Sequence, residues 1–113
     1  MIQIYHNPRC SKSREGFQIL EDSGKEFEVV EYMKNPLTKE ELNLILKKLK
    51  IKPIELIRKN EELWKETYKN KNLSDDELIE IMVEHPNLIE RPIAINGNKA
   101  VIGRPPVLIK DIL

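Results

Sequence analysis

The sequence feature that most constrains the fold is an Asn-Gly pair near the C-terminus. Asn96-Gly97 stands between two short apolar runs, Ile93-Ala94-Ile95 and Ala100-Val101-Ile102. Asn-Gly in this setting is the strongest short-range signal for a β-hairpin, because both central residues of the favoured turn take positive φ. We therefore expect a sheet that includes two adjacent antiparallel strands from this segment.

The N-terminal third predicts a second pair of strands, joined by a helix. Ile2 to Tyr5 reads as a short strand, and Phe27 to Tyr32 is rich in the aromatic and β-branched residues that favour another. Between them the pattern predicts a helix from about Ser11 to Ser23, with Gly24 as its stop. Strands connected by a helix are expected to run parallel.

The middle of the chain predicts helices. Thr38 to Glu41 and Ser74 to Glu77 both have the spacing of a capping box, and Pro86 should end the second helix near His85. One or two shorter helices are expected between Pro53 and Tyr68. A last short helix should begin at the pair Pro105-Pro106.

The predicted order is therefore βαβ, a helical stretch, then ββα. This order indicates an α/β fold with a mixed four-stranded sheet and flanking helices. We expect one domain over residues 1–113, with a helical insertion at about 38–86 between the halves of the sheet. The sequence shows no internal repeat, low-complexity stretch or flexible linker that would divide it.

Composition excludes several classes of protein. Nineteen basic and nineteen acidic residues give a net charge of zero, without the basic excess of a nucleic-acid binder. No apolar run approaches the length of a membrane span, and the first residues lack the pattern of a signal peptide. The single cysteine excludes a disulfide-linked scaffold. We expect a soluble, cytoplasmic monomer with neither nucleic acid nor membrane among its partners.

The cysteine itself, Cys10, is placed where the first loop turns into the first helix. Unpaired backbone N–H groups and the helix dipole favour a thiolate there, and the same groups can bind an oxyanion. Arg9, Lys12 and Arg14 add positive charge around it. The alternative is a small buried hydrophobic residue, the more common fate of a lone cysteine. The polar and charged neighbours on both sides favour the functional reading.

Residue spacing argues against two other kinds of site at this segment, a phosphatase-type anion loop and a zinc site. A phosphatase-type anion loop needs an arginine six positions after the cysteine, where this chain has Gly16. A zinc site needs about four ligands, and this chain has one cysteine and two histidines with no paired spacing. Cys10 to Ser13 is a Cys-x-x-Ser, so a second thiol must come from another molecule.

Around Cys10 the chain resembles the active-site loop of the glutaredoxin-coupled arsenate reductases, which are thioredoxin-fold proteins with a helical insertion. Four segments carry the resemblance in order along the chain: His6 to Arg14, Leu56 to Asn60, His85 to Ile93 and Ile102 to Pro105. A thioredoxin-like fold agrees with the βαβ and ββα order derived above. One departure lies directly after Cys10, where Ser11-Lys12 replaces the Gly-Thr of the family and adds a charge at the anion site.

The resemblance implies an activity and the residues that perform it. A Cys10 thiolate would attack arsenate, glutathione would add as co-substrate, and glutaredoxin would resolve the product, with no bound cofactor and no metal. The matching positions imply that His6 supports the thiolate and that Arg58, Arg91 and Arg104 bind the oxyanion. An arginine fork suits such an anion, since it is permanently charged and presents several donors. Thioredoxin-like folds also commonly place a cis-proline opposite the cysteine, which predicts a cis bond at Arg91-Pro92.

Two alternative functions stay open. A related thioredoxin-fold regulator would bind RNA polymerase and turn over no substrate, but such regulators usually carry Cys-x-x-Cys and lack His-Asn-Pro before it. Here His6-Asn7-Pro8 is present and the second cysteine is absent. A family member that keeps the fold but reduces a different disulfide or oxyanion is the second alternative, which ranks behind arsenate reduction.

Overall fold

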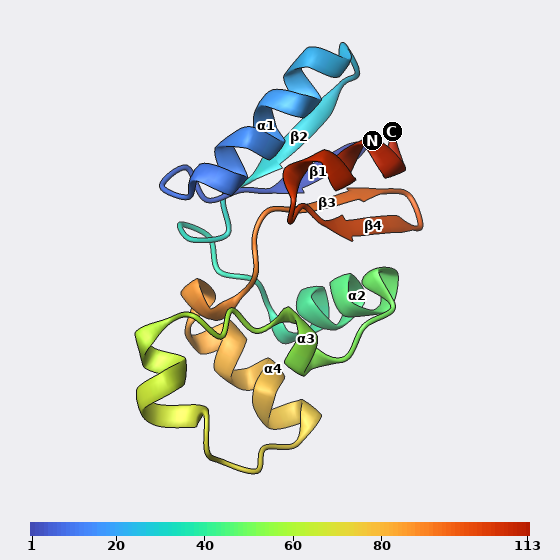
Figure 1. Cartoon of the computed structure of the whole chain (residues 1–113). Helices are drawn as coiled ribbons and strands as arrows, with labels where there is room; N and C mark the ends of the chain where they lie inside the picture. Colours follow the sequence, from blue (N-terminus) through green and yellow to red (C-terminus); the bar gives the residue numbers. More distant parts are fainter. The chain divides into compact units, whose positions relative to one another are not determined.

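The computed structural model describes all residues from 1 to 113. They form two compact units (Figure 1): a sheet unit, made of Met1–Asn35 and Arg91–Leu113, and a helical unit, Pro36–Glu90. The chain thus leaves the sheet unit once and returns to it just before the C-terminal hairpin. The helical unit is slightly longer at both ends than the predicted insertion.

The sheet unit is built on four short strands: β1 (Ile2–Tyr5), β2 (Phe27–Val30), β3 (Ile93–Asn96) and β4 (Lys99–Ile102). Their order is β2-β1-β3-β4, with β1 parallel to β2 and antiparallel to β3, and with β3 antiparallel to β4. The predicted α/β class with a mixed four-stranded sheet is confirmed. Strand β2 ends two residues earlier than predicted, because Glu31 begins a turn in which its carbonyl accepts the N–H groups of Lys34 and Asn35.

Two helices belong to the sheet unit and pack against one another. Helix α1 (Ser11–Ser23) ends at Gly24, whose φ of 73° is the left-handed conformation that glycine adopts without strain. The C-terminal helix η3 (Pro106–Ile112) is a 3-10 helix. Their apolar sides form one core with the sheet, which buries Ile4 of β1, Leu20 of α1 and Ile109 of η3 completely.

The helical unit contains three α-helices: α2 (Lys39–Leu49), α3 (Pro53–Leu56) and α4 (Asp75–Glu84). Both predicted capping boxes are present: Thr38 Oγ1 and Ser74 Oγ accept the N–H of the glutamate three residues on. Between α3 and α4 lies a π-helical turn, η1 (Trp64–Tyr68), and a 3-10 turn, η2 (Pro86–Leu88), follows α4.

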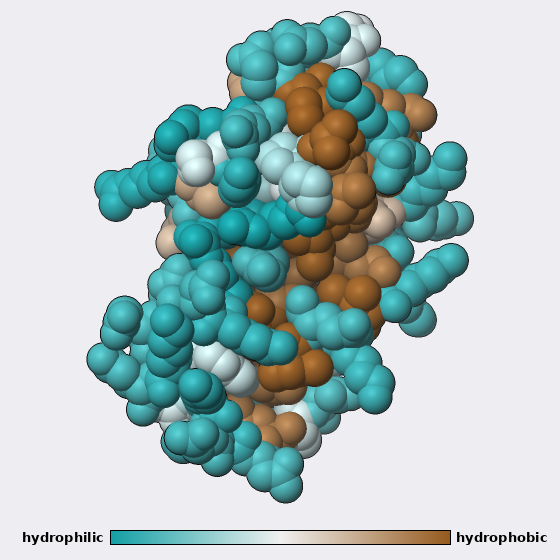
Figure 2. All heavy atoms as spheres, in the orientation of Figure 1, coloured by the Kyte–Doolittle hydropathy of each residue, from teal (hydrophilic) through white to brown (hydrophobic).

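Charged and polar side chains cover much of the face seen in Figure 2, in keeping with a charged fraction of 34%. The longest helix, α1, has 13 residues, and none of the helices combines the length and the apolar character that crossing a bilayer requires.

Candidate thiol site

Cys10 is the N-cap residue of α1, as the sequence predicted. Its backbone is extended, with φ −96° and ψ 124°, and its carbonyl accepts the N–H of Arg14, which begins the helical hydrogen-bond ladder. The Cys10 N–H donates to the carbonyl of Asn7 at 3.0 Å. The side chain is largely buried, with 9% of its surface exposed. The loop from Asn7 to Cys10 therefore holds the thiol in a defined position at the start of the helix.

The pKa of Cys10 is lowered from 9.0 to about 7. Burial has the largest individual effect and raises this pKa, since it disfavours the charged form. The backbone N–H of Ser13, the hydrogen bond and charge of Arg91, and the backbone N–H of Lys12 together outweigh burial. The neutral thiol makes no capping hydrogen bond, so these N–H groups are available to the thiolate. About half of the thiol is ionised at neutral pH.

Ser13, the serine of the Cys-x-x-Ser segment, is buried and was not among the predicted site residues. Its side chain is fully buried, and its Oγ accepts the N–H of Asn7 at 2.9 Å and lies 2.7 Å from Nδ1 of His6. A serine three positions after an N-cap cysteine is the signal that could have identified it. Ser13 therefore ties the strand end and the loop to the first turn of α1.

His6, the second predicted catalytic residue, is also buried. Its ring stacks on Phe17, with the centroids 5.4 Å apart, and its hydrogen bond is with Ser13. Burial lowers the pKa of His6 below 6.5, against the opposing charge of Glu31. The ring is therefore mainly neutral at pH 7. Its connection to Cys10 passes through Ser13, whose backbone N–H favours the thiolate.

Arg91 and Arg104, two of the three predicted anion-binding arginines, meet in the sheet unit. Arg91 is 8% exposed and interacts with the Cys10 sulfur, while Nη1 of Arg104 donates to the carbonyl of Arg91 at 3.0 Å. The predicted cis bond at Arg91-Pro92 is present, and a second cis bond at Arg104-Pro105 was not predicted. Both arginines thus precede a cis-proline beside the thiol loop.

Pro92 is enclosed by two glycines. A Cβ atom added to Gly16 would lie 2.9 Å from Cγ of Pro92 and 2.7 Å from Cδ1 of Ile109, and one added to Gly103 would lie 2.9 Å from the same Cγ. Real Cβ atoms essentially never approach so closely. Glycine at position 16 therefore lets α1 pack directly on the proline that follows Arg91.

Arg58, the third predicted arginine, lies in the helical unit. Its backbone N–H donates to the carbonyl of Leu88 at 2.7 Å, beside an isolated bridge between Ile57 and Ile89. Its Nε lies 3.6 Å from Glu61, and its Nη1 is buried without a hydrogen-bond partner. A role for Arg58 at the thiol stays a prediction.

Lys12, Arg14 and Arg9 were predicted to surround Cys10 with positive charge, but their side-chain charges are not among the causes of its lowered pKa. Lys12 pairs with Glu15 at 3.6 Å, and Nη1 of Arg14 donates to the carbonyl of Pro8 at 2.9 Å. Of the three cations, Lys12 lowers the pKa of Cys10, and it does so through its backbone N–H. The side chain of Arg9 is exposed and makes no ion pair.

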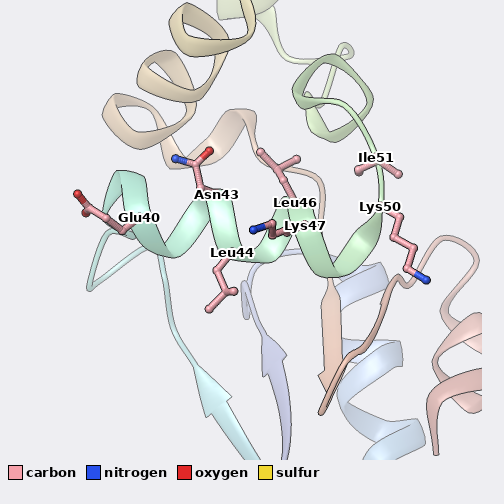
Figure 3. Close-up of a pocket in the computed structure, with 7 residues that line it drawn as sticks. All are labelled: Glu40, Asn43, Leu44, Leu46, Lys47, Lys50 and Ile51. Carbon is pink, nitrogen blue, oxygen red and sulfur yellow. The ribbon is translucent and has the colours of Figure 1, made fainter.

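A cavity of about 730 Å³ runs along α2 in the helical unit and is drawn in Figure 3. Its lining combines lysines with apolar side chains: Glu40, Asn43, Leu44, Leu46, Lys47, Lys50 and Ile51. None of the predicted site residues is among them. No group of three or more His, Cys, Asp or Glu residues lies close enough together to hold a metal ion.

Comparison with known proteins adds a family and close relatives. The model of the ArsC family matches residues 5–112. An arsenate reductase of Haemophilus influenzae is 46% identical over 114 residues, covering 99% of this chain and 98% of that protein. The uncharacterized protein YfgD of Escherichia coli K12 is 45% identical, covering 99% of this chain and 96% of that protein.

The solved structures agree with the sequence relatives. An arsenate reductase from Vibrio cholerae superposes with a TM-score of 0.93 at 42% identity, covering 99% of this chain and 97% of that one. The sheet order and the helices described above are thus those of a known thioredoxin-like architecture.

Proposed function

The chain belongs to the ArsC family, and from this premise we propose that it reduces arsenate to arsenite with Cys10 as the nucleophile. The observation that carries the proposal is the Cys10 thiol at the start of α1, with a pKa lowered to about 7 by backbone N–H groups and Arg91. A thiolate attacks arsenic, and a thiol does not. The relatives from Haemophilus influenzae and Vibrio cholerae carry the name of this activity.

In the first step the Cys10 sulfur forms a bond to arsenic, and one arsenate oxygen leaves as water after taking up protons. Arg91 and Arg104 bind the remaining oxygens and offset the charge that develops on the departing one. His6 keeps the loop in position through Ser13. Arg58 is proposed as a third ligand of the oxyanion.

Reduction of arsenic from +5 to +3 takes two electrons, which two thiols supply when they become a disulfide. This chain contributes one thiol, so the other must be external. We assign it to glutathione, whose sulfur displaces a second oxygen, as water, from the Cys10-bound arsenic. The two sulfurs then join as a disulfide between Cys10 and glutathione, both arsenic–sulfur bonds break, water adds to the reduced arsenic, and arsenite leaves. Glutaredoxin reduces the mixed disulfide and restores the Cys10 thiol. A reaction that consumes reduced glutathione belongs in the cytoplasm, where thiols are kept reduced.

The test is an assay of arsenite formation with purified protein, arsenate, glutathione and glutaredoxin. The wild type should turn over and a Cys10→Ser variant should not, while both keep the same circular dichroism spectrum. The proposal would be overturned if Cys10→Ser formed arsenite as fast as the wild type, or if the wild type formed no arsenite. Absence of turnover together with binding to RNA polymerase would instead favour the regulator.

A further inference from the structure

A groove of about 490 Å³ adjoins the thiol loop, and its lining contains none of the residues assigned a role in the chemistry above. Asn7, Pro8 and Arg9 line one side, and Glu31, Met33 and Lys34 line the other. We propose that this groove binds glutathione beside Cys10, an inference that rests on the proposed function and names the site of its second substrate.

The groove follows from how the two parallel strands end. Past the last paired residues, Tyr5 and Val30, the N–H of His6 donates to the carbonyl of Val30 at 2.9 Å. The two segments that leave β1 and β2 are therefore neighbours. Each is held by its own turn: Asn7 Oδ1 accepts the N–H of Arg9, and the Glu31 carbonyl accepts two N–H groups of the following turn. The walls are formed before any ligand arrives, which lowers the cost of ordering them on binding.

The charges of the groove match those of the tripeptide. Glutathione at neutral pH carries two carboxylates and one ammonium group, and the groove offers two cations, Arg9 and Lys34, and one anion, Glu31. Arg9 makes no ion pair, so its guanidinium is available for bidentate binding of a carboxylate. Lys34 and Glu31 pair with each other at 3.6 Å on the surface, a weak interaction that ligand charges can replace. Met33 is 42% exposed and offers apolar area to the methylene groups of the peptide.

The position of Arg9 also suits delivery of a thiol to Cys10. Arg9 directly precedes Cys10, so their Cα atoms are about 3.8 Å apart. A tripeptide extends over roughly 10 Å, with its cysteine in the middle. The length of the tripeptide therefore exceeds the Cα separation between the groove residue Arg9 and Cys10.

The first experiment measures binding without turnover. S-methylglutathione, whose sulfur cannot react, is titrated into ¹⁵N-labelled wild type, and the amide signals of residues 7–9 and 31–34 should shift. Arg9→Gln should raise the dissociation constant by about threefold to fivefold and Lys34→Gln by about twofold, as expected for exposed charge pairs. The matched control is Lys99→Gln, an exposed lysine on β4 at the opposite edge of the sheet, which should change nothing.

The second experiment separates this inference from the proposed function. In arsenite assays Arg9→Gln should raise KM for glutathione but not for arsenate, and the alkylation pKa of Cys10 should stay near 7, because Arg9 is not among the groups that shift it. If Arg9→Gln and Lys34→Gln both form arsenite with the wild-type KM for glutathione and bind S-methylglutathione as the wild type does, the proposed groove site is overturned and the proposed reductase activity stands. If S-methylglutathione binds in a way that depends on Arg9 but no arsenite forms, the groove site is supported and the proposed reductase activity is overturned.

Discussion

Helix α1 of the sheet unit begins differently from α2 and α4 of the helical unit. In α2 and α4 the N-cap is Thr38 or Ser74, whose side-chain oxygen accepts the N–H of the third helical residue at 3.1 or 3.2 Å. In α1 the N-cap is Cys10, and its neutral side chain accepts no such bond. The equivalent N–H, that of Ser13, is instead a main cause of the lowered pKa of the thiol.

The first turn of α1 also differs in charge from the first turns of α2 and α4. Helices α2 and α4 carry acidic residues there, which interact favourably with the helix dipole, and α1 carries none. The start of α1 thus keeps its N–H groups and dipole for a negative charge that forms only when Cys10 ionises. The same backbone N–H groups thus have different acceptors: a side-chain oxygen in α2 and α4, which stabilises the fold, and the Cys10 thiolate in α1.

The largest effect that tests this comparison is expected from Ser13→Ala. It leaves the Asn7 N–H and His6 Nδ1 without their buried partner, which should lower the free energy of unfolding by about 2–3 kcal/mol. Urea denaturation at pH 7 measures it. Ser74→Ala at an exposed cap is the matched control and should lose about 1 kcal/mol. Equal losses in the two variants would mean that Ser13 is an ordinary first-turn residue.

A smaller effect is expected from Arg91→Gln. Removal of the guanidinium takes away one of the hydrogen bonds to the thiolate and a nearby positive charge, so the pKa of Cys10 should rise from about 7 toward 9.0. At pH 7 a rise of about one unit lowers the thiolate fraction about fivefold. The pH dependence of alkylation by iodoacetamide measures both quantities. An unchanged profile would mean that the backbone N–H groups alone set the ionisation.

The contrast also explains which parts could be predicted from the sequence. The capping boxes, the Gly24 stop and the hairpin at Asn96-Gly97 depend on local hydrogen bonds and backbone preferences, and all three are present. Local signals of the same kind predict that Cys10 lies at a helix start, and it is the N-cap of α1.

What could not be predicted depends on contacts between distant segments. The hydrogen bond of Ser13 with His6 forms only when the end of β1 packs against α1. The contact of Gly16 with Pro92 joins residues that are 76 positions apart in the chain. The π-helical turn at Trp64–Tyr68 has no local signal that separates it from an α-helix.

The smallest expected effect is a gain in stability for Cys10→Ser. The Cys10 backbone already has the extended conformation of the N-caps Thr38 and Ser74, so a serine hydroxyl can accept the N–H that the neutral thiol leaves free. At a pH below 7, where the thiol is protonated, Cys10→Ser should therefore be about 0.5–1 kcal/mol more stable than the wild type.

This advantage should shrink as the pH rises. The folded Cys10 has a pKa of about 7 against 9.0 for the ordinary thiol, so between these values the unfolded chain binds more protons and the wild type gains stability with increasing pH. Serine does not titrate, and the two stability curves should converge or cross between pH 7 and 9. Thermal unfolding of both proteins at pH 6, 7, 8 and 9 measures the difference. Parallel curves over this range would show that the α1 N–H groups do not favour the thiolate, and the distinction between the two kinds of helix start would then fail.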